Sequence, residues 1–131
     1  MTSSELSLKS CDFLKMTSTA IVDEDFINQI ETLYNSAFSE DLKRIFSLCG
    51  EVIFLEDEAH DFLRVLSRKE IISASQDLEI DFVDLMLIPL IDTGDNDFIA
   101  YDLGENHWCM FNIVDEIKFK ENQSLSEYLS V

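Results

Sequence analysis

Acidic residues crowd one short stretch of the chain, where Asp92, Asp95, Asp97 and Asp102 follow one another closely. Carboxylates gathered in this way can bind Ca²⁺ or Mg²⁺, so a metal-dependent carboxylate enzyme is one hypothesis. The segment from Asp92 to Asp97 does not match the D-x-[DN]-x-[DN]-G pattern of a calcium-binding loop, and no glutamate stands at the twelfth position. Asp and Asn are also the residues that tight turns favour. The pattern therefore indicates a turn, and the sequence predicts neither a metal nor a cofactor.

The side chains that usually serve as nucleophiles and bases occur here without their catalytic motifs. The two histidines are His60 and His107, and no G-x-S-x-G segment accompanies them. The three cysteines, Cys11, Cys49 and Cys109, lack the C-x-x-C spacing of a zinc site and do not form the even-numbered set of a disulfide framework. None of the three glycines belongs to a nucleotide-binding loop. The sequence predicts a protein that is not an enzyme.

The charge balance is strongly acidic. The chain has 9 Lys and Arg against 27 Asp and Glu among 131 residues, a formal net charge of −18. Such a charge repels polyanions, which argues against binding to nucleic acid or to an anionic membrane surface. It speeds encounter with a basic partner instead. We therefore expect a basic protein as the partner.

Two acidic segments are the candidate partner-binding surface, and the single tryptophan is a candidate anchor. One segment is an acidic loop at residues 56–61, and the other is the turn described above with the acids that follow it. An exposed Trp ringed by carboxylates would suit a basic partner, although Trp is more often a core residue. The candidates are Glu56, Asp57, Glu58, Asp61, Asp92, Asp95, Asp97, Asp102, Glu105 and Trp108.

Length and segment types predict one cytoplasmic domain over residues 1–131. The first residues lack the basic and apolar regions of a secretory signal. No apolar run approaches the roughly 18 residues of a membrane-spanning helix. Residues 1–22 remain poorly defined, because their apolar side chains fit either a short helix or an added strand.

The centre of the predicted fold is a three-stranded antiparallel meander. Three runs, 85–91, 97–102 and 107–114, are rich in β-branched and aromatic residues. Two short segments that contain Gly, Asn and Asp separate them, as tight turns require. Pro89 cannot donate a ladder hydrogen bond, so we expect it at an edge or a bulge.

Helices and short strands surround this meander in the prediction. Apolar spacing predicts a helix from Asp23 and a second one that begins after Ser39 and stops at Gly50. Two short strands, 51–55 and 61–66, form a hairpin around the acidic loop. Helices start at the S-x-x-E boxes of residues 67–70 and 124–127, the first of them short and followed by an ambiguous segment, 76–84. Residues 117–119 indicate a brief further strand. This order predicts an α+β fold, with a single mainly antiparallel sheet on which N-terminal helices, a mid-chain helix and a C-terminal helix pack.

Several segments occur in the order found in a known superfamily. Residues 38–46, with Cys49-Gly50 after them, are similar to its LPxxYxxFL…NGG segment, and residues 62–71 to its strand followed by SxEEI. Residues 88–90 and 94–102 are similar to its IxIGxxGxGDxYxxD meander, and Val114-Asp115 with residues 124–129 to its xxD…SFxEFL end. Over residues 23–131 the chain therefore resembles the SUKH superfamily, which includes bacterial toxin-immunity proteins and eukaryotic regulators of cell-wall synthesis.

The resemblance implies an α+β fold without catalysis, with a cleft or a sheet face that binds a protein. Many bacterial members are thought to be immunity proteins made beside a secreted toxin, frequently a nuclease. The expectation is an immunity protein that neutralises a basic toxin by occluding its active or substrate-binding surface. A regulatory or scaffold module and the metal-dependent enzyme remain the alternatives.

Overall fold

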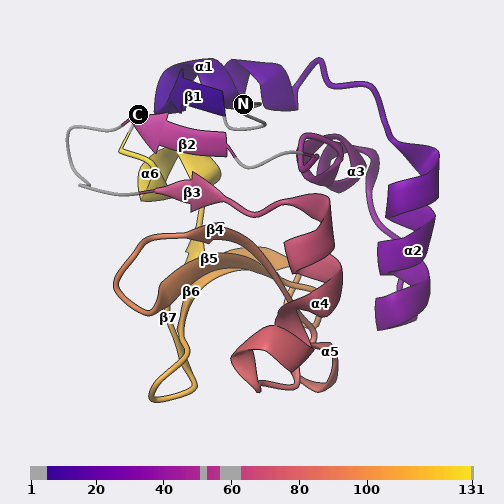
Figure 1. The fold of residues 1–131 in the computed structure, drawn as a ribbon, viewed down its shortest axis with the longest axis vertical. Helices are drawn as coiled ribbons and strands as arrows, with labels where there is room; N and C mark the ends of the chain where they lie inside the picture. The colour runs from indigo at the N-terminus through magenta and orange to yellow at the C-terminus, as the bar shows by residue number, and fades with distance from the viewer. Residues whose placement is uncertain (1–5, 51–52, 57–62, 131) are drawn as a thin grey trace, which may run out of the picture.

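The computed structural model describes residues 6–50, 53–56 and 63–130, which form a sheet with helices before, within and after its strands (Figure 1). The strands of this part of the chain are β1 (Leu6–Lys9), β2 (Ile53–Glu56), β3 (Arg64–Val65), β4 (Leu87–Asp92), β5 (Asp97–Asp102), β6 (His107–Asn112) and β7 (Ile117–Gln123). The helices are α1 (Ser10–Thr17), α2 (Glu24–Tyr34), α3 (Glu40–Ser47), α4 (Arg68–Leu78), α5 (Phe82–Leu85) and α6 (Leu125–Tyr128).

The strands lie side by side in chain order, from β1 to β7. The pair β1 and β2 is parallel, and every other neighbouring pair in the described residues is antiparallel. The predicted α+β class with a mainly antiparallel sheet is therefore confirmed. The N-terminal segment takes both of its predicted forms in succession, because the strand β1 leads directly into the helix α1.

The meander is present as β4, β5 and β6, and β7 extends it. A register shift between Pro89 and Ile91 confirms the predicted bulge at the proline, which lies in an inner strand. β4 starts at Leu87, two residues later than the predicted run, because Leu85 ends α5. β6 ends at Asn112, two residues before the end of the third predicted run. Asn112 ends β6 because its side-chain oxygen accepts the backbone N–H groups of Val114 and Asp115 and so forms a turn.

Side-chain caps start most of the helices where the sequence predicts. Asp23 caps α2, Ser39 caps α3, and both S-x-x-E segments form complete capping boxes. Two helix ends were predicted wrongly. α3 ends at Ser47, before Gly50, and the Ser47 hydroxyl ties its last turn to α2 by accepting the Asp23 N–H at 2.8 Å. α4 is longer than expected, and α5 occupies part of the ambiguous segment.

Buried apolar side chains form two clusters around the sheet. The larger cluster joins α2, α3 and α6 to the strands, with Phe46 stacked on Trp108 at 6.2 Å between ring centroids. The smaller cluster lies between α4, α5 and the meander, where Phe82 meets Phe111 edge-on at 5.8 Å. The Tyr34 hydroxyl joins α2 to the meander by donating to the Leu87 carbonyl at 2.7 Å. The meander strands β4 to β6 are therefore packed from both faces.

Candidate functional site

The structure divides the acidic candidates of the meander between two places. Asp97 opens β5 and Asp102 ends it, and the rise of five steps along the extended strand separates them by about 17 Å. Asp92 and Asp95 lie with Asp97, whereas Glu105 lies with Asp102 in the turn before β6. The four aspartates therefore do not form the single carboxylate cluster on which the metal-enzyme hypothesis depends.

Two of the acids in the turn at residues 92–97 accept hydrogen bonds from groups of the protein. Asp92 Oδ1 accepts the backbone N–H of Gly94 at 2.8 Å, and Asp97 Oδ1 accepts from the Asn112 side chain at 2.8 Å. Gly94 and Asn96 both have left-handed backbone angles, with φ of 89° and 64°. These are the roles that tight turns assign to Asp, Gly and Asn. Asp95 is exposed at the tip and is free to meet a partner.

A small pocket lies between α4 and this turn. Its cavity volume is about 100 Å³. Apolar side chains form part of its lining, and three carboxylates and one guanidinium form the remainder. The apolar residues are Leu66, Ala74, Leu78 and Phe98, and the charged residues are Arg64, Glu70, Asp77 and Asp92. We call this site the α4 pocket.

Arg64 organises the charged side of the α4 pocket. Its Nη1 donates to both carboxylate oxygens of Glu70, at 2.6 and 2.7 Å, and its Nη2 reaches Asp92 at 3.4 Å. Burial raises the pKa of Glu70, but hydrogen bonds from Arg64 and from the Ser67 backbone outweigh it, so this pKa lies below its ordinary value. Asp77 is exposed and pairs only with the Ser73 hydroxyl among the described residues. The pocket therefore keeps a negative rim.

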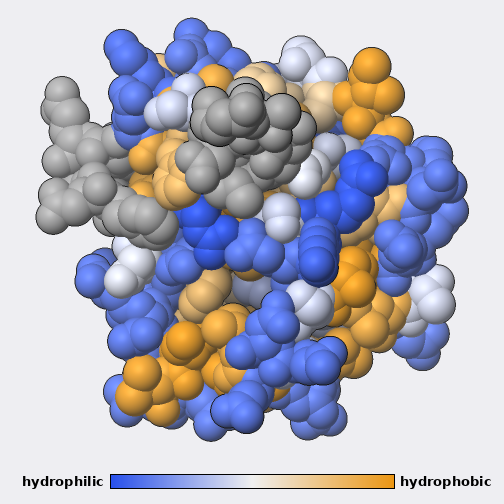
Figure 2. Space-filling model, viewed as in Figure 1, coloured by the Kyte–Doolittle hydropathy of each residue, from blue (hydrophilic) through white to orange (hydrophobic). Residues whose placement is uncertain are grey.

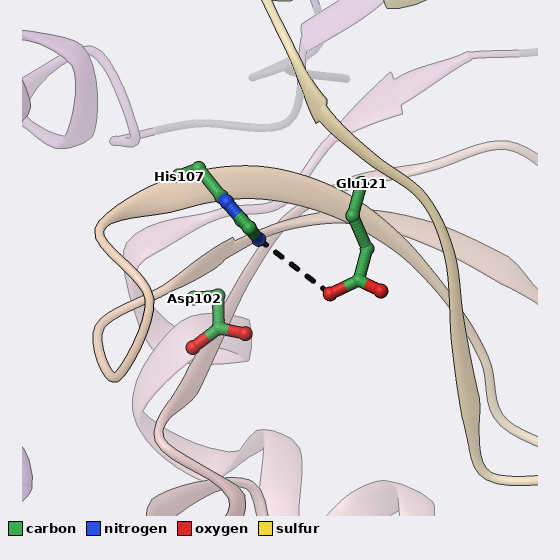
Figure 3. A group of neighbouring side chains, drawn as sticks. All are labelled: Asp102, His107 and Glu121. Atoms are coloured by element: carbon green, nitrogen blue, oxygen red, sulfur yellow. Dashed lines mark ion pairs between the residues drawn. The ribbon is translucent and has the colours of Figure 1, made fainter.

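A second group of ionisable side chains lies where β5 ends and β6 begins. Asp102 and His107 are cross-strand partners, so their side chains emerge side by side from the same face. Glu121 of β7 completes the group, and its Oε1 lies 3.5 Å from His107 Nε2 (Figure 3). Asp102 is 2% exposed and accepts the Glu105 N–H at 3.1 Å. We call Asp102, His107 and Glu121 the β-end cluster.

Lys118 supplies the positive charge of the β-end cluster. Its Nζ lies 2.8 Å from Asp102 Oδ2 and 4.0 Å from Glu121 Oε1. The hydrogen bond to Asp102 raises the pKa of Lys118 and outweighs the opposing effect of burial. The Asp102 carboxylate is thus buried but compensated, which places it out of reach as a surface contact for a partner protein.

A bulge in β7 places Glu121. The register with β6 pairs Trp108 with Gln123 and Met110 with Phe119, so residues 120–122 lie opposite the single residue Cys109. Tyr128 of α6 fills this bulge. Its hydroxyl donates to the carbonyls of Lys120 and Trp108, the latter at 3.1 Å, and accepts the Gln123 N–H at 3.4 Å. The C-terminal helix therefore fixes the geometry of the β-end cluster.

Trp108 and the cysteines belong to the packed interior. Trp108 is half-buried, with Tyr101 edge-on at 5.0 Å in addition to Phe46. Burial raises the pKa of the Cys49 thiol and, with the charge of Asp102, raises the pKa of Cys109 to about 12. These two thiols are therefore held in the protonated, unreactive form.

The other predicted contact residues lie in and around the acidic loop. Glu56 is exposed at the end of β2, and its carboxylate accepts the Ser7 hydroxyl at 3.0 Å. Asp57, Glu58 and Asp61 lie outside the described residues. Their part in binding stays a prediction.

More than half of the basic side chains form ion pairs within the chain. Of the nine Lys and Arg residues, five form ion pairs with acids of the described segments: Lys43, Arg44, Arg64, Arg68 and Lys118. Hydrophilic side chains cover much of the face shown in Figure 2, with apolar patches between them. The acids without a basic neighbour therefore set the sign of the surface potential.

The sequence predictions missed four of the charged residues that matter here: Arg64, Asp77, Lys118 and Glu121. Arg64 lies in the short strand β3, and Glu70 belongs to the capping box that follows this strand at the start of α4. Their closeness in the sequence could have indicated their contact. Lys118 and Glu121 carry no such signal, because their positions depend on the bulge in β7.

Comparison with known proteins leaves the site to be interpreted from its own chemistry. No protein-family model matches the chain, and no match is found among curated proteins or among solved structures. Within residues 6–50, 53–56 and 63–130, no helix has both the length and the apolar character needed to cross a membrane.

Proposed function

We propose that this protein is an immunity-type inhibitor, which binds a basic toxin, a nuclease being the expected class, and occludes its active or substrate-binding surface. The observation that carries the proposal is the α4 pocket with its acidic rim beside the exposed tip of the 92–97 turn. The resemblance of the sequence to the SUKH superfamily adds support, and the α+β class of the chain is compatible with it.

The α4 pocket has the size and lining to receive one basic side chain. At about 100 Å³ it is smaller than the roughly 300–1,000 Å³ of most small-molecule sites. Leu78 and Phe98 offer apolar surface to the methylene stem of a lysine or arginine, and Asp77 at the rim offers a carboxylate to its charged end. A protruding basic residue of the partner is therefore the occupant that this chemistry favours.

The overall charge favours the same kind of partner. A nuclease needs a basic surface to hold phosphate groups, and a protein of net charge −18 is attracted to that surface over long range. Even with five basic residues paired to acids of the described segments, acidic residues remain in large excess over basic ones and sustain this attraction. Electrostatic steering of this kind raises the association rate more than it strengthens the final complex.

Co-expression with the product of the neighbouring gene tests the proposal. We expect a stable complex and protection of the cells from that protein. The double substitution Asp77→Lys with Asp95→Lys should lower the association rate about tenfold or more at low salt. Asp12→Lys with Glu24→Lys is the matched control, because it changes the net charge equally on exposed first-turn positions of α1 and α2.

The possible outcomes separate the surface from the function. Equal slowing by both double variants would refute the α4 pocket as the contact and leave only a general charge effect. A complex without protection of the cells would refute the immunity function and favour a regulatory or scaffold role. No complex and no protection would refute both parts of the proposal.

A further inference from the structure

The β-end cluster combines donors that ordinary surface ion pairs do not combine. Asp102, His107 and Glu121 each place one donor atom within 4.8 Å of the other two (Figure 3). Two carboxylate oxygens and one imidazole nitrogen are a donor set that suits Zn²⁺ and related transition-metal ions, whereas Mg²⁺ and Ca²⁺ prefer oxygen alone. The chemistry of the cluster therefore points to a divalent transition metal.

The distances in the cluster are close to those of a metal site. Bonds of about 2.0–2.2 Å to a tetrahedral Zn²⁺ place neighbouring donor atoms about 3.3–3.6 Å apart. The 3.5 Å between His107 Nε2 and Glu121 Oε1 already lies in that range. Asp102 projects from the strand position directly opposite His107, and one of its carboxylate oxygens lies within 4.8 Å of the donor atoms of His107 and Glu121.

One donor of the cluster lacks a hydrogen bond in the structure. His107 Nε2 is buried and has no hydrogen-bond partner among the described residues, although Glu121 lies within ion-pair distance. A buried polar atom in this state destabilises the folded protein, and native structures contain few of them. A metal ion bound between His107 and Glu121 would satisfy this nitrogen.

A cation already lies within the cluster. The Lys118 ammonium is hydrogen-bonded to Asp102 and lies 4.0 Å from Glu121, where it compensates their negative charge. Its side chain is 37% exposed and comes from an exposed position of β7, so it has room to turn toward solvent. A divalent ion would take over its role with two charges instead of one.

From these observations we propose that Asp102, His107 and Glu121 bind one divalent transition-metal ion, with Zn²⁺ as the representative, and that Lys118 gives way when the ion enters. The competing ammonium lowers the affinity of the native site and makes binding depend on the residue at position 118. This site is independent of the α4 pocket and of the proposed inhibitor function.

Calorimetric titration with Zn²⁺ in the presence of excess Mg²⁺ tests the proposal, because Mg²⁺ saturates exposed acids that bind metals weakly. We expect one Zn²⁺ per chain. Lys118→Met should bind about tenfold more tightly, and His107→Gln and Glu121→Gln about tenfold or more weakly. Glu116→Gln, an exposed acid of the adjacent turn, is the control and should leave the affinity unchanged.

A second readout keeps the test independent of folding defects in the variants. In a His60→Ala background, His107 is the only histidine, and its ring NMR signals should shift on addition of Zn²⁺. The proposal is overturned if the native protein and Lys118→Met both fail to bind Zn²⁺. It is equally overturned if binding persists undiminished in His107→Gln and Glu121→Gln, or if the His107 signals do not move.

Discussion

Tyr128→Phe is the substitution that examines most directly how the C-terminal helix shapes the meander. It removes one oxygen from a side chain that is 5% exposed and leaves the ring in place. That oxygen is hydrogen-bonded to the carbonyls of Trp108 and Lys120 and to the N–H of Gln123, which are backbone groups at the β7 bulge. The substitution therefore separates hydrogen bonding from packing.

The expected cost follows from the groups left without a partner. A buried backbone group that loses its hydrogen bond costs about 1–3 kcal/mol. The bulge residues Lys120, Glu121 and Asn122 are exposed, so water can reach part of this site and the net loss should be about 1–2 kcal/mol. With an unfolding entropy of about 2.1 cal/mol/K per residue, a chain of 131 residues should lose about 4–7 °C in Tm.

Thermal and urea unfolding of the variant measure this loss, with Tyr101→Phe as the matched control. The Tyr101 hydroxyl makes no hydrogen bond to the described residues, so its removal should change stability by less than about 0.5 kcal/mol. Hydrogen exchange of the Gln123 amide should accelerate in Tyr128→Phe alone. Equal stability of the two variants would refute the conclusion that the Tyr128 hydroxyl holds the bulge.

Three further predictions concern ionisable groups. Glu70→Gln keeps the capping box but removes a carboxylate whose pKa is lowered in the folded state. The ionised carboxylate stabilises the protein above its ordinary pKa of 4.5, and this stabilisation is lost as pH falls through the folded-state pKa. In urea unfolding the variant should therefore lose about 0.5–1 kcal/mol at neutral pH, and its stability should depend less on acid pH. Tyr34→Phe should lower the free energy of unfolding by about 1 kcal/mol at neutral pH, because it removes the hydrogen bond to Leu87. Burial raises the pKa of Tyr34 above its ordinary 10.0, so the native protein should lose up to about 1.4 kcal/mol of stability per pH unit above pH 10, and the variant should lack this loss. Thiol labelling of the native protein should modify Cys11, which is partly exposed, before Cys49 and Cys109, and equal labelling rates would refute the burial of the latter two.

Local chemistry made much of the fold predictable from the sequence. Capping boxes depend on two residues three positions apart, so Ser67 with Glu70 and Ser124 with Glu127 could be located without knowledge of the rest of the chain. The bulge at Pro89 is equally local, because proline lacks the N–H that a regular ladder requires. The meander followed from turn residues that stand between apolar runs.

The parts that could not be predicted depend on contacts between distant segments. The pairing of Asp102 with Lys118 crosses from β5 to β7, and the bulge that places Glu121 is fixed by Tyr128 of α6. The α4 pocket likewise required α4 to continue to Leu78, past the point where its apolar spacing becomes ambiguous. Such positions are set by tertiary packing, which overrides local propensity.

The two proposed sites use the same strand in different ways, and their separation has a consequence. The α4 pocket adjoins the start of β5, and the β-end cluster lies at its end, about 17 Å away. This distance is about twice the Debye length at physiological ionic strength, so a metal ion at one end should hardly alter the potential felt by a partner at the other. Zn²⁺ should therefore stabilise the protein without changing the association rate of the partner. A change in that rate would mean that the ion acts through the packing of the sheet, and the Tyr128 contact with the bulge would be the first place to look for the connection.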